Sequence, residues 1–224
     1  MPDSLQWNLL ILVVYGIVVA YVFYQIWLDL DEFISLRWEK EALTQMLEGL
    51  KLEGLVGVKF KLKDLYKPKA LRELEVTIEN KTETRSLLVI WERCTLANFK
   101  GDALRVIRVV PGMSVDLSQS QMDSFIAPGQ KIKAKITVES ALKGDDQGEL
   151  AIASPIFKPD KLGEAAAEGK QFTLRLVIEM TGPTVGTRSG SLHALPCLFT
   201  VYKTPKRRSL YWKPKRKKKK EEED

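Results

Sequence analysis

Histidine and cysteine, which serve many active sites and metal centres, are almost absent from this sequence: its 224 residues include one histidine and two cysteines. The histidine, His193, follows a stretch rich in Gly, Ser and Thr, which favours a loop over a base beside a nucleophile. No Cys-x-x-Cys pair, Walker-type loop or Gly-x-Gly-x-x-Gly pattern occurs. We therefore expect a non-enzymatic protein with no metal and no other cofactor.

The other candidates for chemistry are weak. Cys94 and Cys197 are too few for a disulfide scaffold, and they form either one long-range bridge or, as we favour, two buried apolar side chains. Asp145 and Asp146 lie between two glycines, without the spaced oxygen ligands of a calcium loop. A solvated turn is the simpler interpretation of that acidic pair.

Charge is absent from residues 5–28, and this run is apolar on every face. A helix of about 20 residues at about 1.5 Å each spans the hydrocarbon core of a bilayer. Trp7 and Trp27 lie where the two interfacial belts are expected. The N-terminus lacks the basic region of a signal peptide, and no small-residue cleavage site follows the run. Residues 1–28 are therefore predicted to be a retained transmembrane anchor in the lipid bilayer.

The basic residues near the anchor bear on its orientation. None precedes the apolar run, whereas Arg37 and Lys40 follow it. The positive-inside rule then favours a cytoplasmic location for the rest of the chain, with export of the domain as the alternative. The run Asn80-Lys81-Thr82 matches the glycosylation acceptor pattern, but three residues are too few to decide the side.

Several residues of the anchor are suited to contact another helix. Gly16 and Ala20 form a small-xxx-small pair, which lets two helices approach closely, as in a homodimer. Four further residues are more polar than lipid-facing side chains need to be: Tyr15, Tyr21, Tyr24 and Gln25. Together these positions are a candidate face for another membrane subunit, and ordinary interfacial placement is the alternative.

Residues 29–54 are predicted to form an amphipathic juxtamembrane helix. Apolar residues recur there at three- and four-residue steps, at Phe33, Leu36, Leu43, Met46, Leu47 and Leu50. Gly54 then supplies a stop. The apolar stripe is expected to dock on the following domain or on a partner, while Phe33 and Trp38 are candidates for contact with the bilayer surface.

After Gly54 the apolar period changes from 3.6 to 2, which predicts β-strands. Residues 58–63 alternate between apolar side chains and lysines, and residues 73–79 alternate between apolar side chains and mainly glutamates, so neighbouring strands would pair a Lys row with a Glu row. Further strands are expected at 86–91, 95–99, 103–110, 130–139, 148–153, 172–180 and 198–202, with turns at 80–84, 100–102 and 127–130 and a short helix at 159–168. This spacing predicts a mainly β protein, with an antiparallel β-sandwich over residues 55–202.

The order of these cues also resembles a known class of domain. The chain contains the run LEVTIENKTETRSLLVIWERCTLANFKGDALRV, followed by FIAPGQKIKAKI. A strand that ends at an Asn-rich turn, a following buried aromatic residue (here Trp91) and a Pro-Gly turn before the next strand are similar to the immunoglobulin-like and fibronectin-like modules of bacterial envelope and single-pass membrane proteins. The resemblance covers roughly residues 56–202 and implies an Ig-like sandwich that binds proteins or spaces other parts. The Cys-Trp-Cys spacing of a true immunoglobulin domain is missing.

The chain ends in a strongly charged tail, residues 203–224. Eleven basic residues within 203–220 are followed by four acidic residues, so the tail sums to +7 and residues 1–202 to −1. Such a segment is too polar to fold into a core. Its candidate residues for contact with an anionic surface are Lys206, Arg207, Arg208, Tyr211, Trp212, Lys213, Lys215, Arg216, Lys217, Lys218, Lys219 and Lys220.

Three interpretations of the tail stay open. It binds an anionic leaflet, where each basic residue contributes on the order of 1 kcal/mol; it binds RNA or an acidic protein, with strong salt dependence; or it is a disordered solubilising end. For the whole chain, the leading hypothesis is a membrane-anchored protein-interaction module that acts as an accessory, assembly or scaffold factor of a larger membrane complex. The alternative is a carrier or sensor that holds a small apolar ligand within the β-sandwich.

Overall fold

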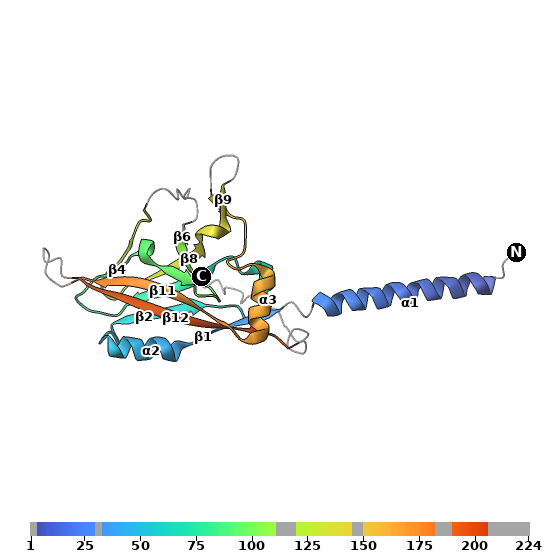
Figure 1. Cartoon of the computed structure of the whole chain (residues 1–224), viewed down its shortest axis with the longest axis horizontal. Coiled ribbons are helices and arrows are strands. Elements are labelled where there is room, and N and C mark those ends of the chain that lie inside the picture. The colour runs from blue at the N-terminus through green and yellow to red at the C-terminus, as the bar shows by residue number, and fades with distance from the viewer. Residues whose placement is uncertain (1–3, 30–32, 111–119, 145–149, 182–189, 206–224) are drawn as a thin grey trace, which may run out of the picture. The chain divides into compact units, whose positions relative to one another are not determined.

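The computed structural model describes residues 4–29, 33–110, 120–144, 150–181 and 190–205 (Figure 1). The chain divides into two units, which are described separately. One comprises Met1–Phe33 with Thr204–Asp224, and the other comprises Ile34–Lys203. The first unit contains the helix α1, Ser4–Asp29. The second contains every other described element, and we call it the β-unit.

The β-unit is mainly β, and its strands pair antiparallel. The strands are β1 (Ile34–Trp38), β2 (Val56–Lys61), β3 (Leu74–Asn80), β4 (Leu87–Val89), β5 (Thr95–Ala97), β6 (Ala103–Val109), β7 (Ser124–Ile126), β8 (Lys131–Val138), β9 (Leu142–Gly144), β10 (Leu150–Ile152), β11 (Gln171–Met180) and β12 (Ser191–Lys203). The helices are α2 (Lys40–Gly49) and α3 (Pro159–Glu168), with short 3₁₀ turns η2 (Pro68–Ala70), η3 (Trp91–Arg93) and η4 (Glu139–Ala141). Both α-helices pack against β12.

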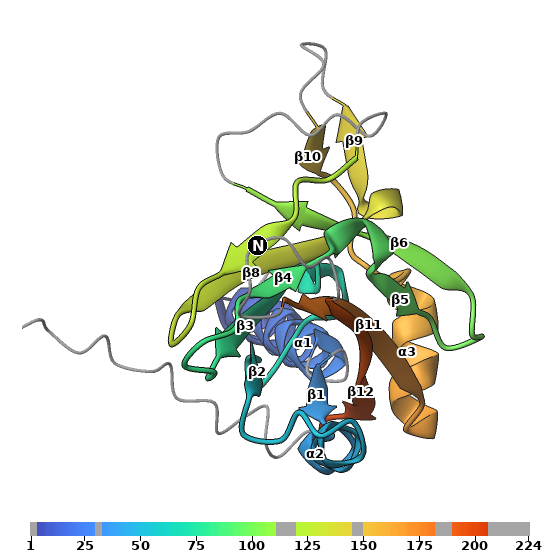
Figure 2. The same cartoon turned by 90° about the vertical axis from the view of Figure 1, so that its left-hand side faces the viewer.

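The strands form a sheet that nearly closes on itself. Its order is β1-β12-β11-β5-β6-β8-β3-β2, with β4 beside β11 and β7 beside β4, while β9 and β10 form a separate ribbon (Figure 2). The two ends of the path approach each other, because Ile34 in β1 and Tyr66, shortly after β2, exchange backbone hydrogen bonds of 2.9 and 2.8 Å. The predicted mainly β, antiparallel fold is therefore confirmed.

The predicted rows of opposite charge face one another on this sheet. β3 lies between β2 and β8, so Glu75 lies opposite Lys61 on one side and Lys135 on the other, while Glu79 lies opposite Lys131 of β8 alone. Lys61 Nζ lies 3.1 Å from a Glu75 carboxylate oxygen, and Lys135 Nζ lies 2.7 Å from Glu73. These pairs are exposed and contribute little to stability, but they favour one register over its neighbours.

The apolar faces of the strands enclose a core crossed by a chain of aromatic rings. Neighbouring ring centroids along this chain are 4.7–5.0 Å apart. In order, the rings belong to Trp38, Phe60, Phe199, Phe172, Phe157 and Phe99. The chain joins β1, β2, β12 and β11 to the segment before α3, so residues far apart in the sequence share one packed interior.

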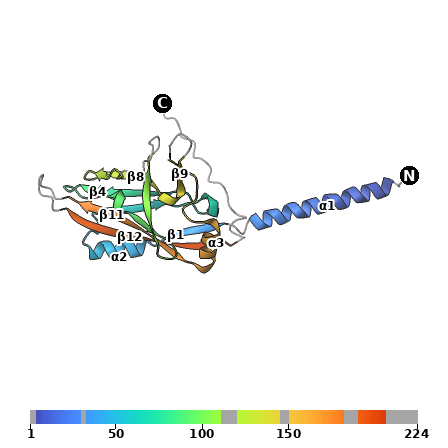
Figure 3. The ribbon, with the colours of Figure 1, turned by 45° about the horizontal axis from the view of Figure 1, so that its top comes forward.

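The predicted helix over residues 29–54 is wrong in its middle part. Ile34–Trp38 form the strand β1, which pairs with β12 from Ile34 opposite Lys203 to Trp38 opposite Phe199 (Figure 3). Ile34 and Leu36 are buried on one face, a period of 2 that the longer helical pattern masked. Among residues 33–54, all of which the structure describes, α2 is the helical part, and its Leu43 and Leu47 are buried in the core of the β-unit. The β-unit therefore begins at Ile34 and not at residue 55.

Other local predictions were right or nearly right. The turn at 100–102 is present, with Gly101 at φ 90°, and so is the turn at 127–130, with Gly129 at φ 69°. The helix predicted at 159–168 is α3, which has Pro at its first position and ends at the left-handed Gly169. The strand predicted at 86–91 is shorter, because the chain turns into η3 after β4. Strands β1, β7 and β9 were not predicted, nor was the first half of β12.

Candidate functional site

α1 is long and apolar enough to span a membrane. The candidate span, Trp7–Ile26, has 20 residues, and none of it is buried within the chain. Trp7 opens the span with an exposed side chain, and Trp27 lies in the last turn of α1. Both positions agree with the predicted interfacial placement, which stays a prediction.

The predicted partner face of α1 divides into parts. Gly16, Ala20 and Tyr24 are four residues apart, so successive positions turn by only about 40° and form one line along the helix. Tyr15 lies about 180° from Tyr24 around the axis and so does not belong to that face. The helix thus places Gly16, Ala20 and Tyr24 on one face, and Tyr15 lies away from it.

A polar pair lies near the end of the span. Tyr21 borders this line, whereas Gln25 lies about 140° from Ala20 around the axis and is linked to the line only through Tyr21. Gln25 Nε2 donates a 2.8 Å hydrogen bond to the hydroxyl of Tyr21, one helical turn away. Tyr21 and Tyr24 are both exposed, about 60° apart around the axis. An amide oxygen and a hydroxyl proton can each form a further hydrogen bond, so the Gln25 carbonyl and the Tyr21 hydroxyl are able to meet a partner group.

Trp38 lies in the β-unit, at the end of β1. Its ring packs edge-on against Phe60 with centroids 5.0 Å apart, and Lys40 Nζ lies 5.6 Å from the centroid of the Trp38 ring. The ring is part of the packing around the core. The residue therefore lies in a strand and not in the predicted helix, and its role at the membrane interface stays a prediction.

The predicted anionic-surface residues, 206–220, lie outside the described residues, as do Asp145 and Asp146. The structure does describe where the tail begins. Lys203 is the last residue of β12 and lies opposite Ile34, the first residue of β1. The start of the tail is therefore fixed beside the start of the β-unit.

A cleft of about 420 Å³ opens between α3 and the turn that joins β5 to β6. Its apolar lining is provided by Phe99, Leu104, Ile156, Phe157 and Ala165. Its charged rim carries four lysines and two acidic residues: Lys100, Lys158, Lys161, Lys170, Asp102 and Glu164. An apolar floor under a rim with a surplus of positive charge suits an amphipathic anion.

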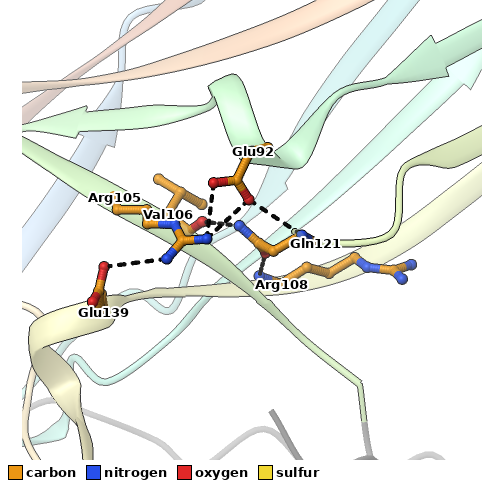
Figure 4. Close-up of polar contacts among 6 residues, drawn as sticks. All are labelled: Glu92, Arg105, Val106, Arg108, Gln121 and Glu139. Atoms are coloured by element: carbon orange, nitrogen blue, oxygen red, sulfur yellow. Dashed lines mark hydrogen bonds and ion pairs between the residues drawn. The ribbon is translucent and has the colours of Figure 1, made fainter. Parts of the chain in front are cut away.

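A polar network lies beside β6 at the point where this strand stops pairing with β5 and begins to pair with β8 (Figure 4). The first half of β6 pairs with β5, and the second half pairs with β8. Arg105 Nη2 donates to both carboxylate oxygens of Glu92, at 2.8 and 3.0 Å, and its Nη1 lies 3.7 Å from Glu139. The hydrogen bond from Arg105 lowers the pKa of Glu92, and Glu92 in turn raises the pKa of Arg105. Both groups stay charged at neutral pH, so Glu92 is poorly suited to proton transfer.

Gln121 completes this network. Its Oε1 accepts from the Arg108 backbone N–H at 2.8 Å, and its Nε2 donates to the Val106 carbonyl at 2.7 Å. Its own backbone N–H donates to Glu92 at 3.2 Å. The side chain thus takes the place of a neighbouring strand beside β6. The network is best understood as structural support for the fold.

The cysteines are free thiols, and both are buried. Cys94 Sγ accepts a 3.3 Å hydrogen bond from the Val177 N–H. Burial raises the pKa of Cys94 to about 11 and raises that of Cys197 as well. The preferred interpretation, two buried side chains without a bridge, is confirmed, and neither thiol is a ready nucleophile at neutral pH.

His193 lies in β12, opposite Ile178, and not in the predicted loop. The Gly- and Ser-rich residues before β12 indicated a loop. The strand forms nevertheless, because β12 pairs with β11. Among the described residues, no group of three or more His, Cys, Asp or Glu side chains is placed to hold a metal ion.

Sequence reasoning missed the cleft. Its walls come from residues 98–104 and 156–170, which are far apart in the chain and carry no shared motif. The local signal was limited to an aromatic residue followed directly by a lysine in each segment, at Phe99-Lys100 and Phe157-Lys158. That pattern is too common to predict a site.

Comparison with known proteins adds no relative: no family model, no curated protein and no solved structure matches this chain.

Proposed function

We propose that this protein is a single-pass, non-enzymatic membrane module that binds a transmembrane helix of a larger membrane complex and serves as an accessory or assembly factor. The observation that supports it is the face of α1 made of Gly16, Ala20 and Tyr24 and bordered by Tyr21, whose hydroxyl accepts a hydrogen bond from Gln25. Lipid chains offer these polar groups no partner, whereas a neighbouring helix can. The same proposal includes two further points: the β-unit is related to immunoglobulin-like modules, and it lies on the cytoplasmic side of the membrane.

The energetics of this face favour a helix as its ligand. Small side chains at Gly16 and Ala20 let two backbones approach closely, and close approach increases van der Waals contact. Hydrogen bonds between transmembrane helices contribute about 0.6 kcal/mol on average, and up to about 2 kcal/mol. The Tyr21–Gln25 pair therefore adds modest affinity, and its directional hydrogen bonds fix the orientation of the two helices relative to one another.

A different subunit fits this face better than a second copy of the chain. Tyr24 continues the line of Gly16 and Ala20 one turn further on, with a bulky, exposed ring. In a symmetric pair, the two Tyr24 rings would hinder close approach along the line. A partner with a small residue opposite Tyr24 avoids this hindrance, so we assign the face to a heterologous helix.

Variants of α1 test the proposal. Ala20→Ile, which blocks close approach, is expected to lower recovery of the partner about tenfold, a loss of about 1.4 kcal/mol. Tyr21→Leu, which removes the hydroxyl that borders this face, is expected to lower it by a smaller factor, because one hydrogen bond between transmembrane helices contributes about 0.6 kcal/mol on average. Tyr15→Leu, a tyrosine change on the opposite face, serves as the matched control and should leave recovery unchanged.

The measurement is quantitative co-purification of the full chain from gently solubilised membranes. The proposal is supported if the same partner proteins are lost with Ala20→Ile and retained with Tyr15→Leu. Purification of the wild-type chain alone, or equal losses on both faces, contradicts it. Recovery of only a second copy of the chain would replace the heterologous contact by a homodimer.

The cleft beside α3 favours a second candidate function, a carrier or sensor for an amphipathic anion such as a fatty acid. Phe99 and Phe157, whose rings lie 4.7 Å apart, would contact the apolar part of such a ligand. Lysines on the rim would contact the carboxylate. This site differs from the sequence-based expectation, because it lies at the surface beside α3 and not within the sheet.

Calorimetric titration of the full chain with laurate tests this candidate. Changing Lys158 and Lys161 to Gln is expected to weaken binding about tenfold, because two cationic partners of the carboxylate are lost. Changing Lys131 and Lys133 to Gln removes the same charge from the open face of β8 and should leave the affinity unchanged. Absence of saturable heat with the unaltered chain, or equal weakening by both pairs, would rule the candidate out.

A further inference from the structure

A further pocket, of about 470 Å³, lies on the outward face of β11 and β12. This face points away from the core, since alternate residues of both strands are buried on the other side. The floor of the pocket is apolar and consists of Val177, Leu192 and Ala194, and its charged residues are Arg93 and Arg175. The fold thus brings two positive charges from distant parts of the chain to one apolar pocket.

The position of Arg93 is fixed by the packing of η3 against β11. Trp91, at the start of η3, is fully buried. The Val177 carbonyl accepts a hydrogen bond from the Ile90 N–H at 3.0 Å, and the Val177 N–H donates to Cys94 Sγ at 3.3 Å. These contacts on either side of η3 hold the turn beside β11, so Arg93 stands over the pocket without support from its own side chain.

The two arginines have no acidic partner within the described residues. Neither forms an ion pair or a side-chain hydrogen bond there. Arg175 lies opposite Thr95 of β5 and Pro196 of β12, and both neighbours are uncharged. Glu179, the acidic residue on the same face of β11, lies against Gly190, where it fills the space that a Cβ would need. The pocket therefore presents positive charge that is not balanced within it.

Exposed apolar side chains continue this face across the sheet. Phe125 of β7, Leu88 of β4, Glu179 of β11 and Leu192 of β12 lie directly opposite one another in turn. Opposed residues of antiparallel strands share one face of a sheet. The Phe125 and Leu192 side chains are both exposed. Exposed apolar side chains beside arginines are typical of surfaces that bind other proteins.

We propose that this face of the β-unit binds a partner protein through an acidic segment of that partner. Asp or Glu side chains of the segment contact Arg93 and Arg175, because a guanidinium pairs with a carboxylate through two parallel hydrogen bonds. A neighbouring apolar side chain of the segment packs on Val177 and Leu192. The contact is separate from the helix contact proposed for α1 and does not depend on it.

The location of the pocket favours a protein over a small molecule. Its lining residues come from η3 and from one face of β11 and β12. A small ligand usually buries most of its surface in its site, which one face of a sheet does not provide. A protein brings a surface of its own to cover the contact, and it can reach the apolar row as well as the arginines.

Selection of displayed random peptides against the full chain in detergent tests the proposal. Peptides that also bind a variant with Arg93→Glu and Arg175→Glu are discarded, which removes those held by other basic parts of the chain. The remaining peptides are expected to carry Asp or Glu next to an apolar residue. Selection against the charge-reversed variant should instead favour Lys or Arg. Both arginines are exposed, so the reversal should leave the circular dichroism spectrum unchanged.

Fluorescence anisotropy then measures the affinity of a selected peptide. Arg175→Ala is expected to weaken binding about tenfold, because one charge-assisted pair is lost. Arg72→Ala, which removes an exposed arginine outside the pocket, should leave the affinity unchanged. The proposal fails if no peptide survives the selection, if the survivors lack acidic residues, or if both substitutions weaken binding equally. A phosphoserine peptide without Asp or Glu that binds more tightly than the acidic peptides would assign the pocket to a phosphoryl group instead.

Discussion

Replacing Phe199 by alanine is expected to lower the free energy of unfolding of the β-unit by about 3–5 kcal/mol. Phe199 is fully buried, at 0% exposure. Its ring stacks on Phe172, with centroids 5.0 Å apart and planes at 8°, and meets Phe60 edge-on at 4.8 Å. Truncation removes the free energy gained by burying the ring, together with both ring contacts. It also leaves a cavity at the centre of the aromatic chain.

The position of Phe199 explains why the loss should be large. The residue lies opposite Trp38 of β1 on one side and opposite Phe172 of β11 on the other. Neighbours held by strand pairing cannot easily collapse into the space left by the ring, and poor relaxation raises the cost of a cavity. The effect should therefore fall at the upper part of the usual range for such substitutions.

Chemical denaturation of the full chain in detergent, followed by near-ultraviolet circular dichroism, measures this loss. Phe125→Ala is the matched control, because Phe125 has 63% of its surface exposed and its truncation should cost less than about 0.5 kcal/mol. If the two variants unfold at the same denaturant concentration, Phe199 does not lie in the core as described.

The parts of the fold that the sequence predicted are those specified by local pattern. The strands around Phe60 and Val76 alternate apolar and charged residues, and Gly101 and Gly129 mark the turns just before β6 and β8. In such segments each side chain already shows which face is buried. The paired Lys and Glu rows could be predicted for the same reason, since they occupy the outward positions of adjacent strands.

The parts that could not be predicted depend on distant pairing. Residues around Leu36 fit a helical stripe as well as a strand, and β1 forms because the edge of β12 is there to receive it. The beginning of β12 around His193 has few strand-forming residues nearby and is held by its register with β11. Both pairings join residues that are far apart in the sequence, so no local pattern indicates them. The same is true of the two walls of the cleft beside α3.

The candidate face of α1 was only partly predictable. Composition identified the span and its polar residues, because an uncharged run of this length is a strong signal. It did not separate Tyr15 from the face that holds Ala20 and Tyr24, which follows from the helical turn angle. Nor could composition show that the tail starts beside Ile34, since that requires the register of β12.

Replacing Asn80 by alanine is expected to destabilise the β-unit by about 3 kcal/mol, although only one polar side chain is lost. Asn80 is 1% exposed. Its Nδ2 donates to the carbonyls of Arg85 and Ile126, at 2.8 and 3.0 Å, and its Oδ1 accepts from the Thr82 N–H at 3.1 Å. Alanine would remove this partner from the Ile126 carbonyl and the Thr82 N–H in a place that water reaches poorly, while the Arg85 carbonyl would keep its hydrogen bond from the Thr82 hydroxyl.

The structure also explains why the match of Asn80 to a glycosylation pattern has no consequence in the folded protein. Its side-chain nitrogen is buried and occupied by two carbonyls, so the residue joins the end of β3 to the following turn and to β7. A glycan acceptor must instead present that nitrogen at the surface. The pattern is therefore a consequence of the turn and carries no information on which side of a membrane the β-unit lies.

Asn98→Ala supplies the matched comparison for this prediction. Asn98 also organises a turn, accepting from the Lys100 and Asp102 N–H groups at 2.8 and 3.1 Å, but at the exposed end of a hairpin. Water can replace its contacts, so its loss should cost less than about 1 kcal/mol. Denaturation curves of the two variants should thus separate clearly. Equal small losses would mean that water reaches the groups around Asn80, and equal large losses would mean that the hairpin turn, and not burial, determines the cost.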